Sequence, residues 1–247
     1  MNGTSNQRVL YLDCASGASG DMLLAALLAL GDAHALCRTL TQALGLPPQA
    51  LRVRRAAARA LSGLQCRVAS QRRERTLLPY LARLQHSRLP RRLRQRAQRI
   101  VRRLIQAEHH VHQGTAHAHR VHELGRLDTL IAIAGCVLAV ERLRVRRVFV
   151  GPLPLGYGWM PSAGGALPNP GPAVLELLRG FPIYMTRLRH ELVTPTAAAI
   201  LSSLTRPLPS RQALVVERIG YGVGTRRMAG VPGVVRACLG RIASPVK

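Results

Sequence analysis

The chain has 247 residues, 47% of them hydrophobic, which suffices for one large domain or two small ones with a buried core. Its formal net charge is +25, and Lys247 is the only lysine among 36 basic residues, so arginine carries this charge. Five scattered cysteines without a CxxC pair exclude a disulfide framework and a thiolate zinc site. No apolar run reaches the ~20 residues that span a bilayer, and the polar start MNGTSNQ is unlike a signal peptide, so we expect a cytoplasmic protein without membrane contact.

The arginine content has two interpretations. Codon bias in a GC-rich genome raises Arg, Ala, Gly and Pro together, and all four are abundant. Alternatively, a dense positive surface attracts nucleic acid phosphates. Only eight aromatic residues are available for base stacking, and no RNA- or DNA-binding module is recognisable, which favours the first interpretation. A basic protein also suits small anionic ligands.

The first elements are expected to be a strand, a loop and a helix. RVLYLD (8–13) is rich in strand-forming residues, CASGASGD (14–21) is a turn of small residues, and MLLAALLAL (22–30) is an apolar helix closed by Gly31. A second helix is expected over 34–45, and 51–58 with 64–70 form a hairpin-like pair of strands. In the basic segment 72–106, apolar residues recur from Leu93 to Ile105 at helical spacing, which indicates a helix with arginines on its solvated face.

The second half should alternate helices and strands. LDTLIAIAGCVLAVERL (127–143) is apolar all round and predicts a buried helix, and RRVFVGPLPLG (146–156) predicts a strand and a turn. The Gly- and Pro-rich stretch 157–172 predicts a long loop without strands, and GYGVGTRR (220–227) is interpreted as a glycine-rich turn rather than a phosphate loop. We expect the α/β class: a single mixed-sheet domain with flanking helices and long functional loops.

Acidic residues number only 11, so their positions are informative. Asp13 ends the first strand and Asp21 begins the first helix. The loop between them could present backbone N–H groups to an anion or orient carboxylates at a cation, although it lacks the GK[ST] ending of a P-loop. Asp21 could equally be a helix cap.

Six of the nine histidines lie between residues 109 and 122, followed by Glu123 and Asp128. His119 and His122 are three residues apart and would share one face of a helix, with Glu123 beside them. Such nitrogen and oxygen donors suit nickel, zinc, cobalt or iron. His109, His110 and His117 are interpreted as exposed residues. A third polar cluster, HELVTPT (190–196), offers Glu191, while Thr194 or Thr196 can cap the helix that follows.

Six segments in the same order resemble the nickel-insertion proteins of the LarC family: LYLDCASGASGDMLLAALLALG, VHELGRLDTLIAIAG, PLPLGYG, LPNPGPAVLELLRGFPIY, ELVTPTAAAIL and ERIGYGVGTR. The resemblance covers nearly the whole chain, and its first and fifth segments are the most specific. It implies a nickel chelatase, a lyase that places Ni²⁺ into the anionic pyridinium-3,5-bisthiocarboxylic acid mononucleotide with CTP to make the nickel-pincer cofactor of lactate racemase.

The resemblance also implies roles for individual residues. It makes Asp13, Asp21 and Glu191 catalytic, and it makes His119, His122, Glu123 and Asp128 ligands of the metal. The substrate would be bound by Ser16, Gly17, Ser19, Gly20, Thr194 and Thr196. We expect Asp13, Asp21, His122, Glu123, Asp128 and Glu191 to converge on one cleft.

The sequence departs from the family pattern at several expected ligands. Arg120 replaces the first histidine of HxHE, Ala132 an aspartate, Gly164 a histidine, and Arg227 an acidic residue. Residues 1–247 are interpreted as the amino-terminal α/β region without the family's carboxyl-terminal domain. CTP and Mg or Mn would therefore bind through that missing domain or a separate carboxyl-terminal LarC-like subunit, and a homo-oligomer is a further expectation. Two alternatives stay open: a degenerate, non-enzymatic metal- or anion-binding paralogue, and an arginine-rich RNA-associated protein.

Overall fold

The structure is a computed structural model that describes residues 8–69, 77–111, 126–162, 165–210, 212–226 and 228–243. Within these ranges the first half contains β1 (Arg8–Asp13), α1 (Gly20–Leu28), α2 (Ala33–Ala43), the short 3-10 helix η1 (Pro48–Ala50), β2 (Leu51–Ala58), β3 (Leu61–Val68), α3 (Leu78–Gln85) and α4 (Arg91–Val111). The second half contains α5 (Leu127–Arg142), β4 (Arg147–Val150), β5 (Leu153–Leu155), β6 (Trp159–Ser162), β7 (Gly165–Pro168), α6 (Pro172–Leu177), β8 (Ile183–Met185), α7 (Pro195–Leu204), β9 (Arg206–Pro207), β10 (Leu214–Val223) and β11 (Val234–Ile242).

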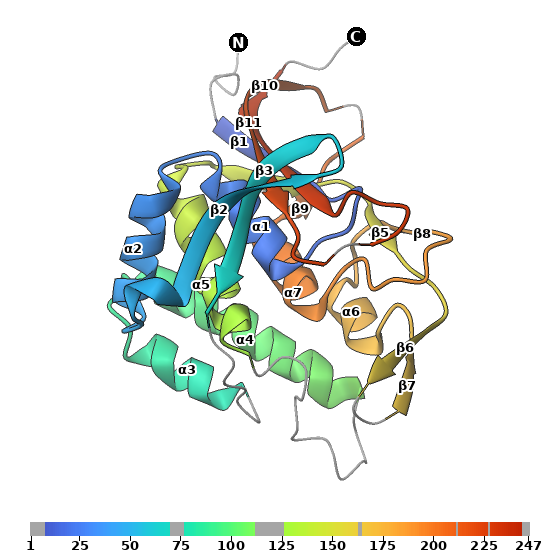
Figure 1. Ribbon diagram of the computed structural model, residues 1–247, viewed down its shortest axis with the longest axis horizontal. Coiled ribbons are helices and arrows are strands. Elements are labelled where there is room, and N and C mark those ends of the chain that lie inside the picture. Colours follow the sequence, from blue (N-terminus) through green and yellow to red (C-terminus); the bar gives the residue numbers. More distant parts are fainter. Residues whose placement is uncertain are drawn as a thin grey trace.

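A seven-stranded mixed sheet in the order β2-β3-β10-β11-β1-β4-β9 forms the centre of the described chain. β1 pairs antiparallel with β11 and parallel with β4, β10 and β11 are antiparallel, and β2 and β3 form the expected hairpin. Helix α1 contacts β3, β10 and β11 on one side and α5 on the other, while α4 lies beyond α5 and also contacts α6 and α7 (Figure 1). The predicted α/β class with one mixed sheet is confirmed.

Helix α1 packs unusually close to β10. A methyl group on Gly222 would lie 2.0 Å from the carbonyl oxygen of Met22, so only a residue without a side chain allows this approach. Gly220 and Gly222 therefore face α1, and by strand alternation Ile219 and Tyr221 face the opposite side of the sheet. The interpretation of 220–227 as a turn was wrong for 220–223, which belong to β10.

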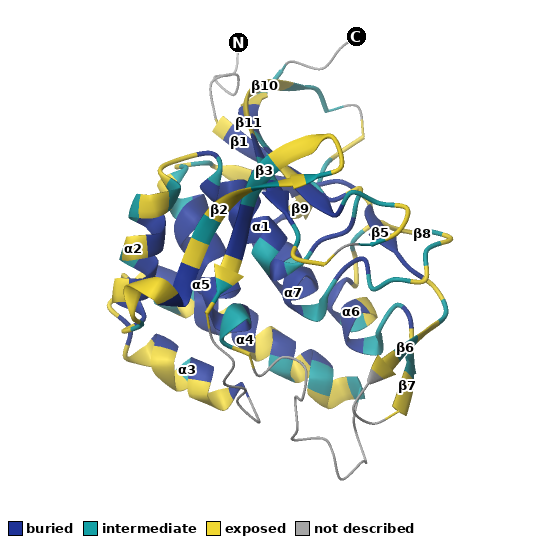
Figure 2. Ribbon diagram, viewed as in Figure 1, coloured by how far each residue is buried: buried dark blue, intermediate teal, exposed yellow. Residues whose placement is uncertain are grey.

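The opposite face of the sheet is less covered. Ile219 is 47% exposed, and Tyr11, Tyr221 and Cys238 are of intermediate burial. On the helical side, by contrast, Leu10 and Leu12 are buried, and α1 and α5 are dark along most of their length in Figure 2. The hydrophobic core thus lies between the sheet and the helices, and the other face is available to present polar side chains.

The long loop expected over 157–172 contains a strand pair instead. β6 and β7 form a two-stranded antiparallel ribbon in which Pro161 pairs with Ala166. Both strands of an isolated ribbon are edges, so a proline without an N–H group is tolerated there. The buried Asn169 side chain donates a hydrogen bond of 2.9 Å to the carbonyl of His190, and this contact ties the stretch to the HELVTPT segment.

Candidate functional site

The loop after β1 is joined to the HELVTPT segment by backbone hydrogen bonds. The Ala18 amide donates to the Leu192 carbonyl at 2.7 Å, and the Thr194 amide donates to the Ala18 carbonyl at 3.0 Å. Gly17 adopts a φ of +89°, a conformation that favours glycine, which lets the loop turn back against Leu192. Two predicted site segments, about 175 positions apart, are therefore neighbours in the fold.

The amino-terminal ends of α1, α5 and α7 meet at Gly20. A methyl group on Gly20 would lie 2.8 Å from the Ala132 side chain of α5 and 3.0 Å from Thr196 of α7. The buried hydroxyls of Thr129 and Thr196 lie 3.5 Å apart at the same junction. Helix amino termini carry partial positive charge, so this junction favours the carboxylates that lie in the first turns of α1 and α5.

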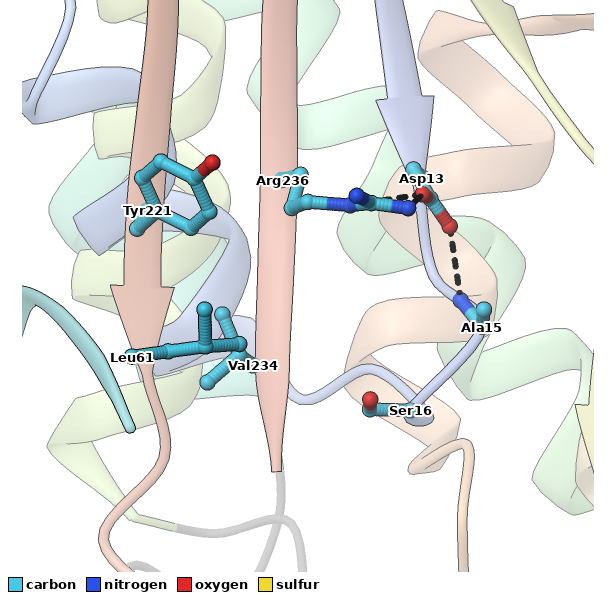
Figure 3. Close-up of a pocket in the computed structure, with 7 residues that line it drawn as sticks. All are labelled: Asp13, Ala15, Ser16, Leu61, Tyr221, Val234 and Arg236. Atoms are coloured by element: carbon cyan, nitrogen blue, oxygen red, sulfur yellow. Dashed lines mark hydrogen bonds and ion pairs between the residues drawn. The ribbon is translucent and has the colours of Figure 1, made fainter. Parts of the chain in front are cut away.

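Asp13 points to the open face of the sheet and pairs with Arg236 of β11. The Arg236 Nε lies 2.8 Å from Asp13 Oδ2, a second guanidinium nitrogen contacts the same oxygen, and Asp13 Oδ1 accepts a hydrogen bond of 3.0 Å from the Ala15 amide (Figure 3). The hydrogen bond to Asp13 raises the pKa of Arg236. The Asp13 side chain is 15% exposed and that of Arg236 52%, so the pair is reached from solvent through the arginine.

Asp21 has a different environment in the first turn of α1. Its Oδ1 accepts a hydrogen bond from the Ser19 hydroxyl, and its Oδ2 is buried without a hydrogen-bond partner in the described part of the chain. Ser19 is the N-cap residue by position, but neither side chain caps the helix. The interpretation of Asp21 as the cap is therefore wrong, and a buried carboxylate oxygen is left to be satisfied by another group.

Asp128 and Glu191 each face an arginine. Arg126 Nε lies 3.2 Å from Asp128 Oδ2, and Arg226 Nη1 lies 3.6 Å from Glu191 Oε2. The Asp128 side chain is 43% exposed and that of Glu191 20% exposed. Asp128 is therefore the more accessible of the two carboxylates.

The structure does not gather the predicted carboxylates into a metal centre by themselves. Within the described ranges, no group of three or more His, Cys, Asp and Glu side chains is placed to hold a metal ion. Asp13, Asp21, Asp128 and Glu191 thus do not form such a group among themselves. The other predicted ligands, His119, His122 and Glu123, lie outside the described residues.

The predicted substrate-binding residues divide into structural and accessible groups. Thr194 is the N-cap of α7, where its hydroxyl accepts a hydrogen bond of 3.3 Å from the Ala197 amide. Gly17 and Gly20 allow the close approaches described above. Ser16 instead lines a pocket on the open face of the sheet, so it is the residue of this set best placed to meet a ligand.

This pocket has a volume of about 120 Å³ and includes residues that the sequence did not indicate. It is lined by Asp13, Ala15, Ser16, Leu61, Tyr221, Val234 and Arg236 (Figure 3). Arg236 lies in VPGVVRACLG, which carries no recognisable motif. Only the pairing of β11 with β1, which places Arg236 opposite Asp13, could have indicated it.

The cysteines are mostly buried thiols. The described structure contains no disulfide among them, and Cys14, Cys37, Cys66 and Cys136 are buried. Burial raises the pKa of the Cys37 thiol from 9.0 to about 11 and also raises those of Cys14, Cys66 and Cys136. None of the cysteines belongs to a group of three or more potential metal ligands among the described residues.

The helices of the described residues include none long and apolar enough to cross a membrane.

A strongly basic α/β protein with an accessible arginine beside a pocket has features that suit the binding of a small anionic ligand. The model of the nickel insertion protein family matches residues 10–246. The chain belongs to the nickel insertion protein family.

Several curated relatives share this similarity. The chain is 36% identical to a nickel insertion protein of Geotalea daltonii, over 97% of this chain and 63% of the relative. It is 40% identical to a nickel insertion protein of Thermomicrobium roseum, over 94% of this chain and 58% of the relative. The pyridinium-3,5-bisthiocarboxylic acid mononucleotide nickel insertion protein of Desulfitobacterium hafniense is 36% identical, over 97% and 60%. The chain thus spans about three fifths of these relatives' length. No solved structure matches it.

Proposed function

We propose that this chain carries Ni²⁺ and the pyridinium-3,5-bisthiocarboxylic acid mononucleotide and inserts the metal during synthesis of the nickel-pincer cofactor. The observation that carries the proposal is the junction of the Asp13–Asp21 loop with the Leu192–Thr194 segment, in a chain of the nickel insertion protein family. The relative in Desulfitobacterium hafniense is named for this substrate.

The donors around the junction suit transient metal binding. Carboxylate and imidazole groups hold Ni²⁺ less firmly than a closed set of thiolates, so a metal bound by them can pass to the sulfur atoms of the substrate. Asp21 Oδ2 has no hydrogen-bond partner among the described residues, and this supports a ligand at this place because a buried carboxylate oxygen without a hydrogen bond is costly.

The predicted imidazole ligands come shortly before Asp128 in the sequence. Asp128 and Thr129 begin α5, whose first turns pack against Gly20 and Thr196. His122 precedes Arg126 by four residues, a separation that an extended chain spans with at most about 14 Å. We propose His119, His122, Glu123 and Asp128 as the metal ligands, with Asp13, Asp21 and Glu191 as the carboxylates that act on the substrate.

We propose that CTP binds outside residues 1–247. The loop between β1 and α1 has no lysine, so it lacks the phosphate-binding residue of a P-loop. We propose that a carboxyl-terminal domain, joined to this chain or supplied as a separate subunit, binds CTP with Mg or Mn. We further propose that the reaction takes place in the cytoplasm and that the chain forms a homo-oligomer.

Nickel binding by the full chain tests the assignment. Calorimetric titration with Ni²⁺ should show stoichiometric binding that the double substitution His122→Ala with Asp128→Ala reduces at least tenfold. The substitutions His109→Ala and His110→Ala, at exposed positions on α4, serve as the matched control and should leave binding unchanged. Equal affinity in all three proteins would refute the ligand assignment.

Cofactor formation tests the activity. The chain, Ni²⁺, the metal-free mononucleotide, CTP and a family carboxyl-terminal domain are incubated together, and the nickel-loaded product is measured by its absorbance. Formation of the product supports nickel insertion. Its absence, with nickel binding intact, supports the degenerate metal-binding paralogue instead.

A further inference from the structure

The pocket on the open face of the sheet is built across three adjacent strands. Asp13 of β1 pairs in register with Arg236 of β11, and Arg236 pairs in register with Tyr221 of β10. The three side chains therefore lie in one row, with Arg236 at the centre extending toward Asp13 and the Tyr221 ring on its other side (Figure 3). The row belongs to the sheet rather than to a loop, so its geometry is rigid.

The walls of the pocket differ in polarity. Leu61 and Val234 lie side by side near the Tyr221 ring and make an apolar wall (Figure 3). Asp13, Ser16 and Arg236 supply the polar wall. A planar ring fits against the apolar wall, and a carboxylate on that ring would reach the guanidinium, whose fork of N–H donors matches a carboxylate.

The volume of the pocket suits one ring with its carboxylate rather than a whole larger ligand. Pockets that bury a drug-sized molecule measure roughly 300–1,000 Å³. At about 120 Å³, this pocket takes a ring with its carboxylate and leaves the rest of a larger ligand outside.

Asp13 occupies the position that such a carboxylate would take. It binds Arg236 through one oxygen only, while its other oxygen is held by the Ala15 amide. Arg236 is half-exposed and can be reached by an incoming anion, whereas the Asp13 side chain is only 15% exposed. When Arg236 turns to a ligand, Asp13 keeps the Ala15 amide as its hydrogen-bond donor. Asp13 thus competes with an incoming anion for the same donors.

We propose that this pocket binds a planar aromatic carboxylate, or its thiocarboxylate analogue, through Arg236, and that Asp13 is an internal competitor which the ligand displaces. The identity of the ring rests on the proposed function, since a pyridinium bearing acid groups at positions 3 and 5 is such a compound. Arg236 is the anion-binding residue, and Asp13 sets the threshold for binding.

The proposal predicts that substitutions of Arg236 and Asp13 change the affinity for the ligand in opposite directions, which a merely structural role of the two residues would not produce. With pyridine-3,5-dicarboxylate as the probe and calorimetry or ligand-detected NMR as the measurement, Arg236→Gln should weaken binding at least tenfold. Arg236→Lys keeps the charge but loses the fork, so its loss should be intermediate. Asp13→Asn removes the competing charge and should tighten binding by about threefold or more.

Arg241→Gln is the matched control. Arg241 lies on the same strand, is 50% exposed and pairs with Glu217 as Arg236 pairs with Asp13, but it does not line the pocket. Its substitution should leave probe binding unchanged. Circular dichroism melting of each variant establishes that the fold is retained.

Four results would overturn the proposal. The first is that the unsubstituted chain does not bind the probe, and the second is that Asp13→Asn binds it more weakly. The third is that Arg236→Gln and Arg241→Gln lose the same binding affinity. The fourth is that inorganic phosphate binds through Arg236 more tightly than the dicarboxylate, which would make the pocket a phosphate subsite. If the probe does not bind as expected but the chain still forms the cofactor, the pocket assignment is wrong and the proposed function is retained. If the probe binds as expected but the chain takes up no nickel, the pocket assignment is retained and the proposed function is rejected.

Discussion

The α-carbon of Gly17 lies against the carbonyl oxygen of Leu192, so closely that an added methyl group would sit 2.3 Å from that oxygen. The same residue has a φ of +89°, which side chains rarely adopt. Glycine alone satisfies both conditions. The contact between the loop after β1 and the segment before α7 therefore depends on this position.

Gly17→Ala should destabilise the protein by about 2 kcal/mol or more, because the methyl group meets backbone atoms and the backbone conformation becomes strained. Urea unfolding measures the change. Gly31→Ala is the matched control, since nothing lies within 4 Å of a methyl group there and its stability should change by less than about 0.5 kcal/mol. Equal stability of the two variants would contradict the close approach.

Thr194→Ala should lower the free energy of unfolding by about 1 kcal/mol, because the N-cap hydrogen bond to the Ala197 amide is lost. Thr194→Ser keeps the hydroxyl and should restore most of the stability. Comparing nickel insertion by these variants separates capping from substrate binding. A loss of activity in Thr194→Ala beyond the unfolded fraction would assign the hydroxyl a second role.

Stability should fall as the pH rises above 9. Burial raises the pKa of the Cys37 thiol from 9.0 to about 11, so between these values the unfolded chain binds fewer protons than the folded protein and unfolding becomes more favourable. Urea midpoints measured from pH 8 to 11 should decrease, less steeply in Cys37→Ala. Cys14, Cys66 and Cys136, whose pKa values burial also raises, contribute further to the slope. A flat profile over this interval would contradict the burial of these thiols.

The exposed arginines of α4 should bind nucleic acid only weakly. Arg91, Arg92, Arg99, Arg102 and Arg103 are exposed along this helix. Fluorescence anisotropy with a short random RNA should show binding at low salt that disappears near physiological salt, as expected for phosphate contacts alone. Arg99→Gln with Arg102→Gln should reduce the salt dependence more than Arg146→Gln with Arg147→Gln. Submicromolar binding at physiological salt, without nickel uptake, would favour the RNA-associated alternative.

Local patterns were sufficient for most elements. The helical spacing from Leu93 to Ile105 predicted α4, and the apolar run after Asp128 predicted α5. They were insufficient for β6 and β7, where prolines and glycines concealed a strand pair, and for Gly220 and Gly222, which serve helix packing rather than a turn. In both places the conformation depends on contact with a partner strand or helix, and the local sequence pattern does not indicate which element that partner is.

The amino-acid sequence by itself determined the α/β class, most helices and the family resemblance, because periodicity and motif order are properties of neighbouring residues. The tertiary structure alone decided that Arg236 meets Asp13, 223 positions earlier, and that Ala18 pairs with Val193. Strand order and register are set by packing of the whole sheet, so two residues far apart in the chain become partners only when that sheet has formed.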